Sequence, residues 1–236
     1  MNDRPLSIFE EGQTLLFNKP LYWTSFDLVN KVRIIIRSNL GIKKIKVGHA
    51  GTLDPLASGL MIICTGRATR KIDEFRDLDK EYVASIYLGA TTPSFDLETE
   101  IDNNYPVNHI TEALIRNVLE DFKGEQKQIP PLYSAKFIEG KRAYEFARKG
   151  IEKVMEPVTV FFREIELLSF QEPVAKIRVV CSKGTYIRSF ARDLGIALKS
   201  GGYLSALERT AIGSLKVNGA YNLEKFQEYV EQMKHI

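Results

Sequence analysis

The chain has 236 residues, of which 44% are hydrophobic, and its 33 Lys and Arg against 30 Asp and Glu give a net charge of +3. This composition excludes a disordered chain and one that binds a polyanion through net charge alone. No apolar run approaches the roughly 20 residues of a membrane span. Near the N-terminus, acidic residues occur at positions where a signal peptide would be apolar. We therefore expect a folded, cytoplasmic, non-membrane protein.

The cysteines and histidines give no sign of a metal site. Cys64 and Cys181 lie in apolar runs without a C-x-x-C motif, so both are predicted to be buried thiols. The histidines, His49, His109 and His235, are too scattered to suggest ligands. No metal is predicted.

The first elements in chain order are a strand over 14–20 and a helix that starts at Thr24 or Ser25. Phe26, Val29, Val32 and Ile36 recur at helical spacing in this helix, which predicts that they face the core. Gly41 is the predicted end of the helix.

Alternating elements follow, without a linker or a repeat. The predicted segments are strands at 60–66, 81–89, 158–170 and 174–182, helices at 110–124, 141–150 and after 182–185, an acidic loop at 96–104 and a last helix over 222–236. Ile110, Leu114, Val118 and Phe122 are predicted to face inward from the second helix. The whole predicts one α+β (mixed α/β) domain over 1–236, with a largely antiparallel mixed sheet flanked by helices.

Charge is unevenly distributed along the chain. No acidic residue occurs from Leu28 to Leu53, whereas six basic residues do: Lys31, Arg33, Arg37, Lys43, Lys44 and Lys46. A local cluster of this kind is typical of a surface that binds nucleic acid, although a solvated helix face is an equally good interpretation of its individual charges.

The stretch GHAGTLDPLASG, residues 48 to 59, contains a single carboxylate among glycines and apolar residues. Asp54-Pro55 could be only a turn. However, the loop follows the basic segment and leads into a buried strand, which places Asp54 at the rim of a sheet on a rigid support. Such a carboxylate is either stabilised by a cation or functional, and Arg188, the last residue of SKGTYIR, is the candidate partner.

Six segments together resemble one known family. They are KPLYWTSFDLVNKVR (19–33), KVGHAGTLDPLASGLMIICTGRATR (46–70), KEYVASIYLGATT (80–92), PPLYSAKFIEGKRAYEFARKG (130–150), CSKGTYIRSFARDLG (181–195) and YLSALERTAIGSL (203–215). In this order they resemble the TruB family of tRNA pseudouridine synthases. The resemblance implies the pseudouridine synthase fold and conversion of uridine 55 in the tRNA T-loop to pseudouridine without a cofactor.

The resemblance also implies roles for individual residues. Asp54 matches the catalytic carboxylate, Arg188 its ion-pair partner, and Tyr82 the tyrosine that stacks on the target base near C5. For RNA binding, His49 matches the histidine that wedges into the T-loop, Tyr186 and Leu207 match residues lining the nucleotide pocket, and Lys19 with Pro20 matches a motif that supports the site. A monomer that binds the T-arm of tRNA is expected.

Two departures from the family pattern are visible. SAKF places Lys136 one position early, with Phe137 where relatives have lysine, and TTPSFDLET has Ser94 for a usual Thr and Thr99 for a usual Gly. In addition, the short segment after SALERTAIGSLKV leads us to expect no separate C-terminal RNA-binding (PUA-type) domain.

Other interpretations remain open at this point. Tyr82 alone could be a half-buried core aromatic, and Arg188 alone a surface arginine. Alternative functions are a synthase of the same family that acts on another RNA or is guided by an RNA–protein complex, an RNA-binding homologue without catalysis, and a nucleoside-cleaving enzyme with one carboxylate.

Overall fold

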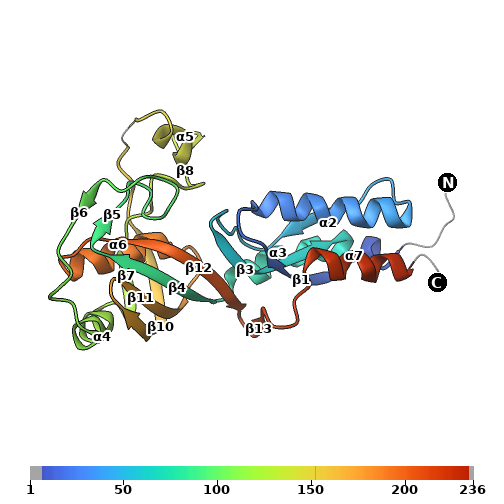
Figure 1. Cartoon of the computed structure of the whole chain (residues 1–236). Helices are drawn as coiled ribbons and strands as arrows, with labels where there is room; N and C mark the ends of the chain where they lie inside the picture. The colour runs from blue at the N-terminus through green and yellow to red at the C-terminus, as the bar shows by residue number, and fades with distance from the viewer. Residues whose placement is uncertain (1–6, 152, 234–236) are drawn as a thin grey trace. The chain divides into compact units, whose positions relative to one another are not determined.

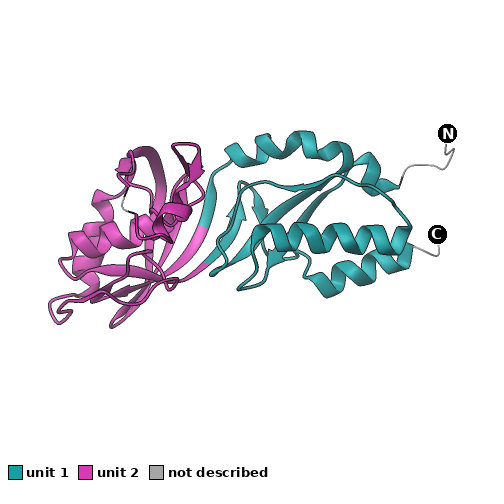
Figure 2. Cartoon of the chain, turned by 90° about the horizontal axis from the view of Figure 1, so that it is seen from above, with its two compact units in different colours: residues 1–81, 208–236 teal, residues 82–207 magenta. Residues whose placement is uncertain are grey.

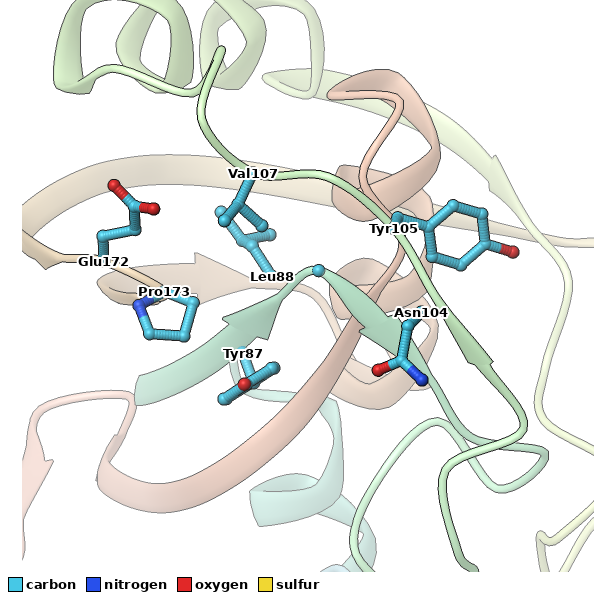
Figure 3. A pocket seen from close by; sticks show the side chains of 8 residues that line it. Tyr87, Leu88, Asn104, Tyr105, Val107, Glu172 and Pro173 are labelled. Atoms are coloured by element: carbon cyan, nitrogen blue, oxygen red, sulfur yellow. The ribbon is translucent and has the colours of Figure 1, made fainter.

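The computed structural model describes residues 7–151 and 153–233 (Figure 1). The chain forms two compact units, one built from residues 1–81 and 208–236 and the other from residues 82–207 (Figure 2). We refer to them as unit 1 and unit 2. Two strands, β4 (Lys80–Leu88) and β12 (Gly202–Ile212), contribute residues to both units. None of the described helices is long and apolar enough to cross a membrane.

Unit 1 is a sheet in the order β1-β3-β12, to which β2 adds on β3 and β13 on β12. Its further elements are α1 (Ile8–Glu11), β1 (Thr14–Lys19), α2 (Ser25–Leu40), β2 (Val47–His49), β3 (Ala57–Thr65), η1 (Gly66–Lys71), α3 (Ile72–Asp77), β13 (Leu215–Lys216) and α7 (Leu223–Gln232). β1 and β3 pair antiparallel with Thr14 opposite Cys64. The predicted strand over 14–20 is thereby confirmed.

The boundaries of α2 follow from its caps. Thr24 accepts a hydrogen bond from the Asp27 N–H while the Asp27 carboxylate accepts from the Thr24 N–H, and Gly41 ends the helix in the left-handed region at φ 63°. These are the predicted ends. One predicted core residue is wrong, because Phe26 is 66% exposed and the buried face runs through Leu28 and its neighbours instead.

Unit 2 continues the sheet in the order β12-β4-β11-β10-β7 (Figure 1). Its further elements are β5 (Ala90–Thr91), β6 (Asn103–Asn104), α4 (Glu112–Asp121), β7 (Gly124–Gln128), β8 (Phe137–Ile138), β9 (Lys141–Arg142), α5 (Ala143–Ala147), β10 (Val158–Gln171), β11 (Val174–Cys181) and α6 (Ile187–Ala197). β10 pairs antiparallel with both β11 and β7. Phe190 of α6 packs on Phe122 and Phe162, which joins helix and sheet in one core.

The α+β fold with a mixed sheet flanked by helices is as predicted, with two local differences. β12 was not predicted as a strand. In α4 the fully buried positions are Ile115 and Leu119, one residue beyond the predicted Leu114 and Val118, which are only half-buried. The predicted terminal helix is α7, and residues 234–236 of that prediction lie outside the described residues.

Candidate active site

Asp54 lies in the loop between β2 and β3 of unit 1, and backbone hydrogen bonds fix the turn around it. The Ala57 N–H donates to the Asp54 carbonyl oxygen (3.1 Å), and the Tyr22 N–H donates to the Pro55 carbonyl oxygen (2.8 Å). Asp54 itself is half-buried. The carboxylate therefore stands on a closed turn rather than on a free loop.

A buried serine holds the loop to the start of α2. The Leu53 N–H donates to the Ser25 Oγ (2.9 Å), and this hydroxyl donates to the Leu53 carbonyl oxygen (3.0 Å). Ser25 is 4% exposed and lies directly after the Thr24 cap. The first residue of the helix thus also positions the residue before Asp54.

A buried arginine of β12 holds the other side of the loop. Arg209 is 1% exposed, and its guanidinium donates to three carbonyl oxygens, those of Leu60 (2.7 Å), Thr52 (3.3 Å) and Gly51 (3.4 Å). Buried charge is tolerated only where hydrogen bonds replace those of water. Arg209 therefore acts as a backbone clamp for the loop that carries Asp54.

Lys19, at the end of β1, is fully buried beneath the same loop. Its ammonium donates to the carbonyl oxygens of Pro20 (2.9 Å) and Trp23 (2.6 Å). Burial lowers the pKa of Lys19 from 10.5 to about 8, while the negative charge of Asp54 opposes this shift and the charge of Arg209 adds to it. Lys19 is thus placed within electrostatic reach of Asp54, as expected of a residue that supports the site.

His49 is the last residue of β2 and lies five positions before Asp54. Its Nδ1 is buried and has no hydrogen-bond partner within the described parts of the chain. Burial lowers the pKa of the imidazole below its usual 6.5, so the ring is mainly neutral at pH 7. A neutral, half-buried ring suits contact with an uncharged base better than contact with phosphate.

Arg188 is buried in the first turn of α6 in unit 2. Its Nε lies 3.6 Å from the Asp96 carboxylate, both side chains being 6% exposed, and its Nη1 donates to the Tyr133 carbonyl oxygen (2.9 Å). The interpretation of Arg188 as a surface residue is therefore wrong. Its predicted pairing with Asp54 stays a prediction, since Asp54 belongs to unit 1.

Asp96 was not singled out from the sequence, where it is the first residue of the predicted acidic loop. In the structure it is buried, and its carbonyl oxygen accepts from the hydroxyls of Thr92 (2.7 Å) and Ser94 (3.2 Å). Ser94 and Thr99 hydrogen-bond each other through their hydroxyls (2.9 Å). The two departures from the family pattern in this segment are thus partners that close the turn presenting Asp96.

The remaining predicted site residues of unit 2 lie on β4, β12 and the start of α6. Tyr82 is 9% exposed in β4, Leu207 is half-buried in β12, and Tyr186 is half-buried at the N-cap of α6. The buried Gln128 side chain accepts from the Tyr186 N–H (2.8 Å) and donates to its carbonyl oxygen (3.1 Å). Strand β7 thereby fixes the backbone from which both Tyr186 and Arg188 project.

The SAKF departure lies on the surface of unit 2. Phe137 is 59% exposed in β8 with the Arg142 guanidinium 3.9 Å above its ring, and the Lys136 ammonium donates to the Glu156 carbonyl oxygen (3.1 Å). The lysine that precedes the usual position is therefore engaged with its own chain. An exposed cation–π pair occupies position 137.

Residues 37–187 match the model of the TruB family of pseudouridylate synthases, N-terminal domain. The chain belongs to this family. It is 58% identical over 224 residues to a tRNA pseudouridine synthase B of Parabacteroides distasonis, covering 95% of both chains. It is 55% identical over 226 residues to the tRNA pseudouridine synthase B of Phocaeicola vulgatus, covering 96% of both chains. The family resemblance seen in the sequence motifs is confirmed.

Solved structures of the same fold come from RNA–protein complexes. One is an H/ACA RNP bound to a substrate RNA containing 2′-deoxyuridine (TM-score 0.71, 25% identity), and another is the archaeal box H/ACA sRNP Nop10–Cbf5 complex (TM-score 0.70, 26% identity). This TruB-family chain is covered over 99% and 98% of its length, and it spans 58% of each of those chains. The predicted pseudouridine synthase-like fold is confirmed.

No group of three or more metal-ligating side chains occurs within residues 7–151 and 153–233. His235 lies outside the described residues. The expectation of a metal-free and cofactor-free site stays a prediction.

Proposed function

We propose that this TruB-family enzyme isomerises uridine 55 in the T-loop of tRNA to pseudouridine, with Asp54 as its only catalytic carboxylate. The observation that carries the proposal is the rigid mounting of Asp54. Ser25, Arg209 and the Pro55 turn hold its loop on three sides, in a chain whose relatives over nearly their whole length are named tRNA pseudouridine synthase B. We place the reaction in the cytoplasm and assign it to a monomer.

One carboxylate is sufficient for this chemistry. A glycosidase needs a second carboxyl group, because it must protonate a leaving group and activate water or form a glycosyl intermediate. In the isomerisation the N1–C1′ bond breaks, uracil remains in the pocket, and a C5–C1′ bond forms. Asp54 either attacks C1′ as a nucleophile or removes the 2′ proton to give a glycal.

The other residues take supporting roles in the proposal. The proton on C5 must leave after the new bond forms, and Tyr82 or Asp54 is the base that removes it. Arg188 pairs with Asp54 and orients it, and Tyr186 with Leu207 lines the nucleotide pocket. His49 inserts where the target base has left its stack, which offsets a flipping cost of a few kcal/mol.

The decisive experiment follows tritium from uridine C5. A tRNA transcript labelled at that carbon must release the label to water on isomerisation, whereas hydrolysis of the glycosidic bond need not release it. We expect release with the wild-type chain, and no release with Asp54→Asn, whose fold and tRNA affinity should be nearly unchanged. Asp73→Asn is the matched control, because Asp73 is an exposed partner of Arg76 in α3. Turnover of Asp54→Asn within tenfold of wild type would contradict the assignment.

The similarity to H/ACA RNP structures supports a second candidate, a synthase guided by RNA and partner proteins. The same assay separates the two functions. A guided enzyme would leave free tRNA unmodified when no other component is present, whereas the proposed function requires turnover with the chain alone.

A further inference from the structure

Tyr22 has a backbone conformation and a side-chain exposure that are both unusual for a tyrosine. Its φ is +66°, in the left-handed region that bulky side chains rarely occupy, and its side chain is 74% exposed. A large aromatic gains nothing from burial at this exposure, while its backbone is strained. Stability of the fold therefore does not account for a tyrosine here.

The surroundings hold Tyr22 rigidly in this conformation. The buried Lys19 ammonium donates to the carbonyl oxygens of Pro20 and Trp23, on either side of Tyr22. The Tyr22 N–H donates to the carbonyl oxygen of Pro55, the residue after Asp54. The exposed ring is thus mounted on the same framework as the candidate catalytic loop.

A second exposed aromatic follows one turn later. Phe26, in the first turn of α2, is 66% exposed, and Leu21 before Tyr22 is 44% exposed. The periodicity of the sequence predicts that Phe26 faces the core, but its side chain is exposed in the structure. We refer to Tyr22 and Phe26 as the aromatic ledge.

The face of α2 that begins at Phe26 continues into polar and then cationic side chains. Asn30, Arg33 and Arg37 follow Phe26 at i+4, i+7 and i+11, so they share its face. The Arg33 guanidinium donates to the Asn30 side-chain oxygen (3.2 Å) and to the Val47 carbonyl oxygen (3.3 Å) of β2, while Arg37 is exposed.

The acid next to Phe26 in the sequence is already engaged in the fold. Asp27, the carboxylate next to Phe26 in sequence, is used by the helix cap, where it accepts hydrogen bonds from both the Thr24 N–H and its hydroxyl. Asp27 is therefore held at the helix cap, and the row on α2 contributes the cations Arg33 and Arg37.

We propose that the aromatic ledge stacks on an unpaired base of the RNA substrate, while Arg33 and Arg37 hold the phosphates of the same strand. Aromatic faces followed by a cationic track are how single-stranded nucleic acid is bound. A protein partner would leave the two cations unmatched unless it supplied carboxylates. The proposal rests on the proposed function and adds to it a binding surface outside the nucleotide pocket.

A substitution at Tyr22 that relieves the backbone strain and removes the ring should keep or raise the stability of the fold while it weakens RNA binding. The two effects can therefore be separated. Tyr22→Gly and Tyr22→Asn both tolerate positive φ and both remove the ring. We expect either variant to resist urea at least as well as wild type, but to bind T-stem-loop RNA with a Kd about 5- to 100-fold weaker. Tyr22→Phe should keep the wild-type Kd. Ile196→Ala, which removes an exposed apolar side chain from α6, outside the aromatic ledge and the row on α2, is the matched control.

Three outcomes are decisive. If Tyr22→Gly and Tyr22→Asn bind the RNA within twofold of wild type, the ledge does not stack on a base. If wild type sediments as a dimer that Tyr22→Gly dissociates, the ledge is an interface between copies, and the proposal is overturned. If wild type releases no tritium, the proposed function is refuted. If wild type releases tritium and Tyr22→Gly and Tyr22→Asn bind the RNA as tightly as wild type, only the role of the aromatic ledge is refuted.

Discussion

At the residue scale, Arg188 is the group whose surroundings differ most from expectation. Its guanidinium lies against Asp96 and the Tyr133 carbonyl, so it is oriented before any contact with Asp54. A planar guanidinium can face two carboxylates at once, which an ammonium cannot do in the same geometry. Asp96 therefore orients the guanidinium that the proposed function pairs with Asp54.

We expect Arg188→Lys to reduce the single-turnover rate by roughly tenfold or more, which is about 1.4 kcal/mol in the barrier, although the charge is kept. Asp96→Asn should also slow this step, because it leaves a buried guanidinium without its anion. The control is Arg116→Lys, since Arg116 pairs with Glu112 on the exposed face of α4. Unchanged single-turnover rates in both site variants would show that the Asp96–Arg188 pair has only a structural role.

Lys19 should make stability depend on pH in an alkaline range. Its pKa is about 8 in the folded chain and 10.5 in the unfolded chain, so between these values the unfolded state binds more protons. The free energy of unfolding therefore gains a contribution from Lys19 as pH rises from about 8 to 10.5, and loses it as pH falls through 8. The full contribution is of the order of 3 kcal/mol.

Urea unfolding of wild type and Lys19→Met at a series of pH values tests this prediction. The difference in unfolding free energy between the two should shift in favour of wild type over that range, because other titrating groups cancel in the comparison. A difference that stays constant with pH would mean that Lys19 keeps its ordinary pKa despite its burial.

At the scale of elements, β3 and β12 come so close at one point that only glycine fits. Gly59 has φ +110°, and a Cβ added there would lie 2.3 Å from the Arg209 carbonyl oxygen. Gly59→Ala must therefore push apart the strand that follows Asp54 and the strand that carries the Arg209 clamp.

We expect Gly59→Ala to lower the free energy of unfolding by more than about 2 kcal/mol, and to lower turnover with it. Gly219→Ala is the control for conformation alone, since Gly219 has φ +85° and nothing within 4 Å of the added Cβ. This control should cost only about 1 kcal/mol. Equal losses in the two variants, measured by urea unfolding, would show that the strands can separate without cost.

The sequence predicted elements well where a local signal marks them. Thr24 and Gly41 bound α2 because capping and left-handed φ are properties of single residues. The exposure of Phe26 and the strand β12 were not predictable in this way. Both depend on which surfaces the rest of the chain covers, and periodicity alone does not contain that information.

The same distinction applies to the candidate site. Asp54 was singled out because its glycine-rich loop follows a basic segment, leads into a buried strand and matches a family motif, and its catalytic role stays a prediction. Asp96 was not singled out, because it stands among other acids in DLETEIDNN and only its burial separates it from them. The apolar neighbours Phe95 and Leu97 were the one available signal. Arg209 shows no local signal, since its carbonyl partners are 149 to 158 positions away.

For the whole molecule, the proposed RNA contacts concern one part of the substrate. The Asp54 loop, His49 and the cationic row on α2 are all assigned to the T-loop and the strand beside it. We therefore expect an isolated T-stem-loop RNA to be modified with a kcat/KM within about tenfold of full tRNA.

Binding of the RNA should weaken with salt. The logarithm of the binding constant should fall with the logarithm of the salt concentration with a slope of about −4 to −6, if the six basic residues of 28–53 make most phosphate contacts.

The comparison needs two RNAs at one salt concentration and a salt series for one of them. A loss of a hundredfold or more on the stem-loop would reveal recognition of distant parts of tRNA through a surface not identified here. A slope near zero would show that the six basic residues of 28–53 do not contact the phosphates.

The discontinuity of unit 1 has a consequence for the order in which the enzyme is made. The guanidinium that clamps the Asp54 loop follows Leu60, the carbonyl partner nearest to it in the sequence, by 149 residues, and all of unit 2 is encoded between them. At about 5 to 20 residues per second, a ribosome needs about 7 to 30 s to cover that distance. During this interval the nascent chain contains Asp54 but lacks the arginine that holds its loop. The loop therefore reaches its clamped form only after Arg209 has been synthesised.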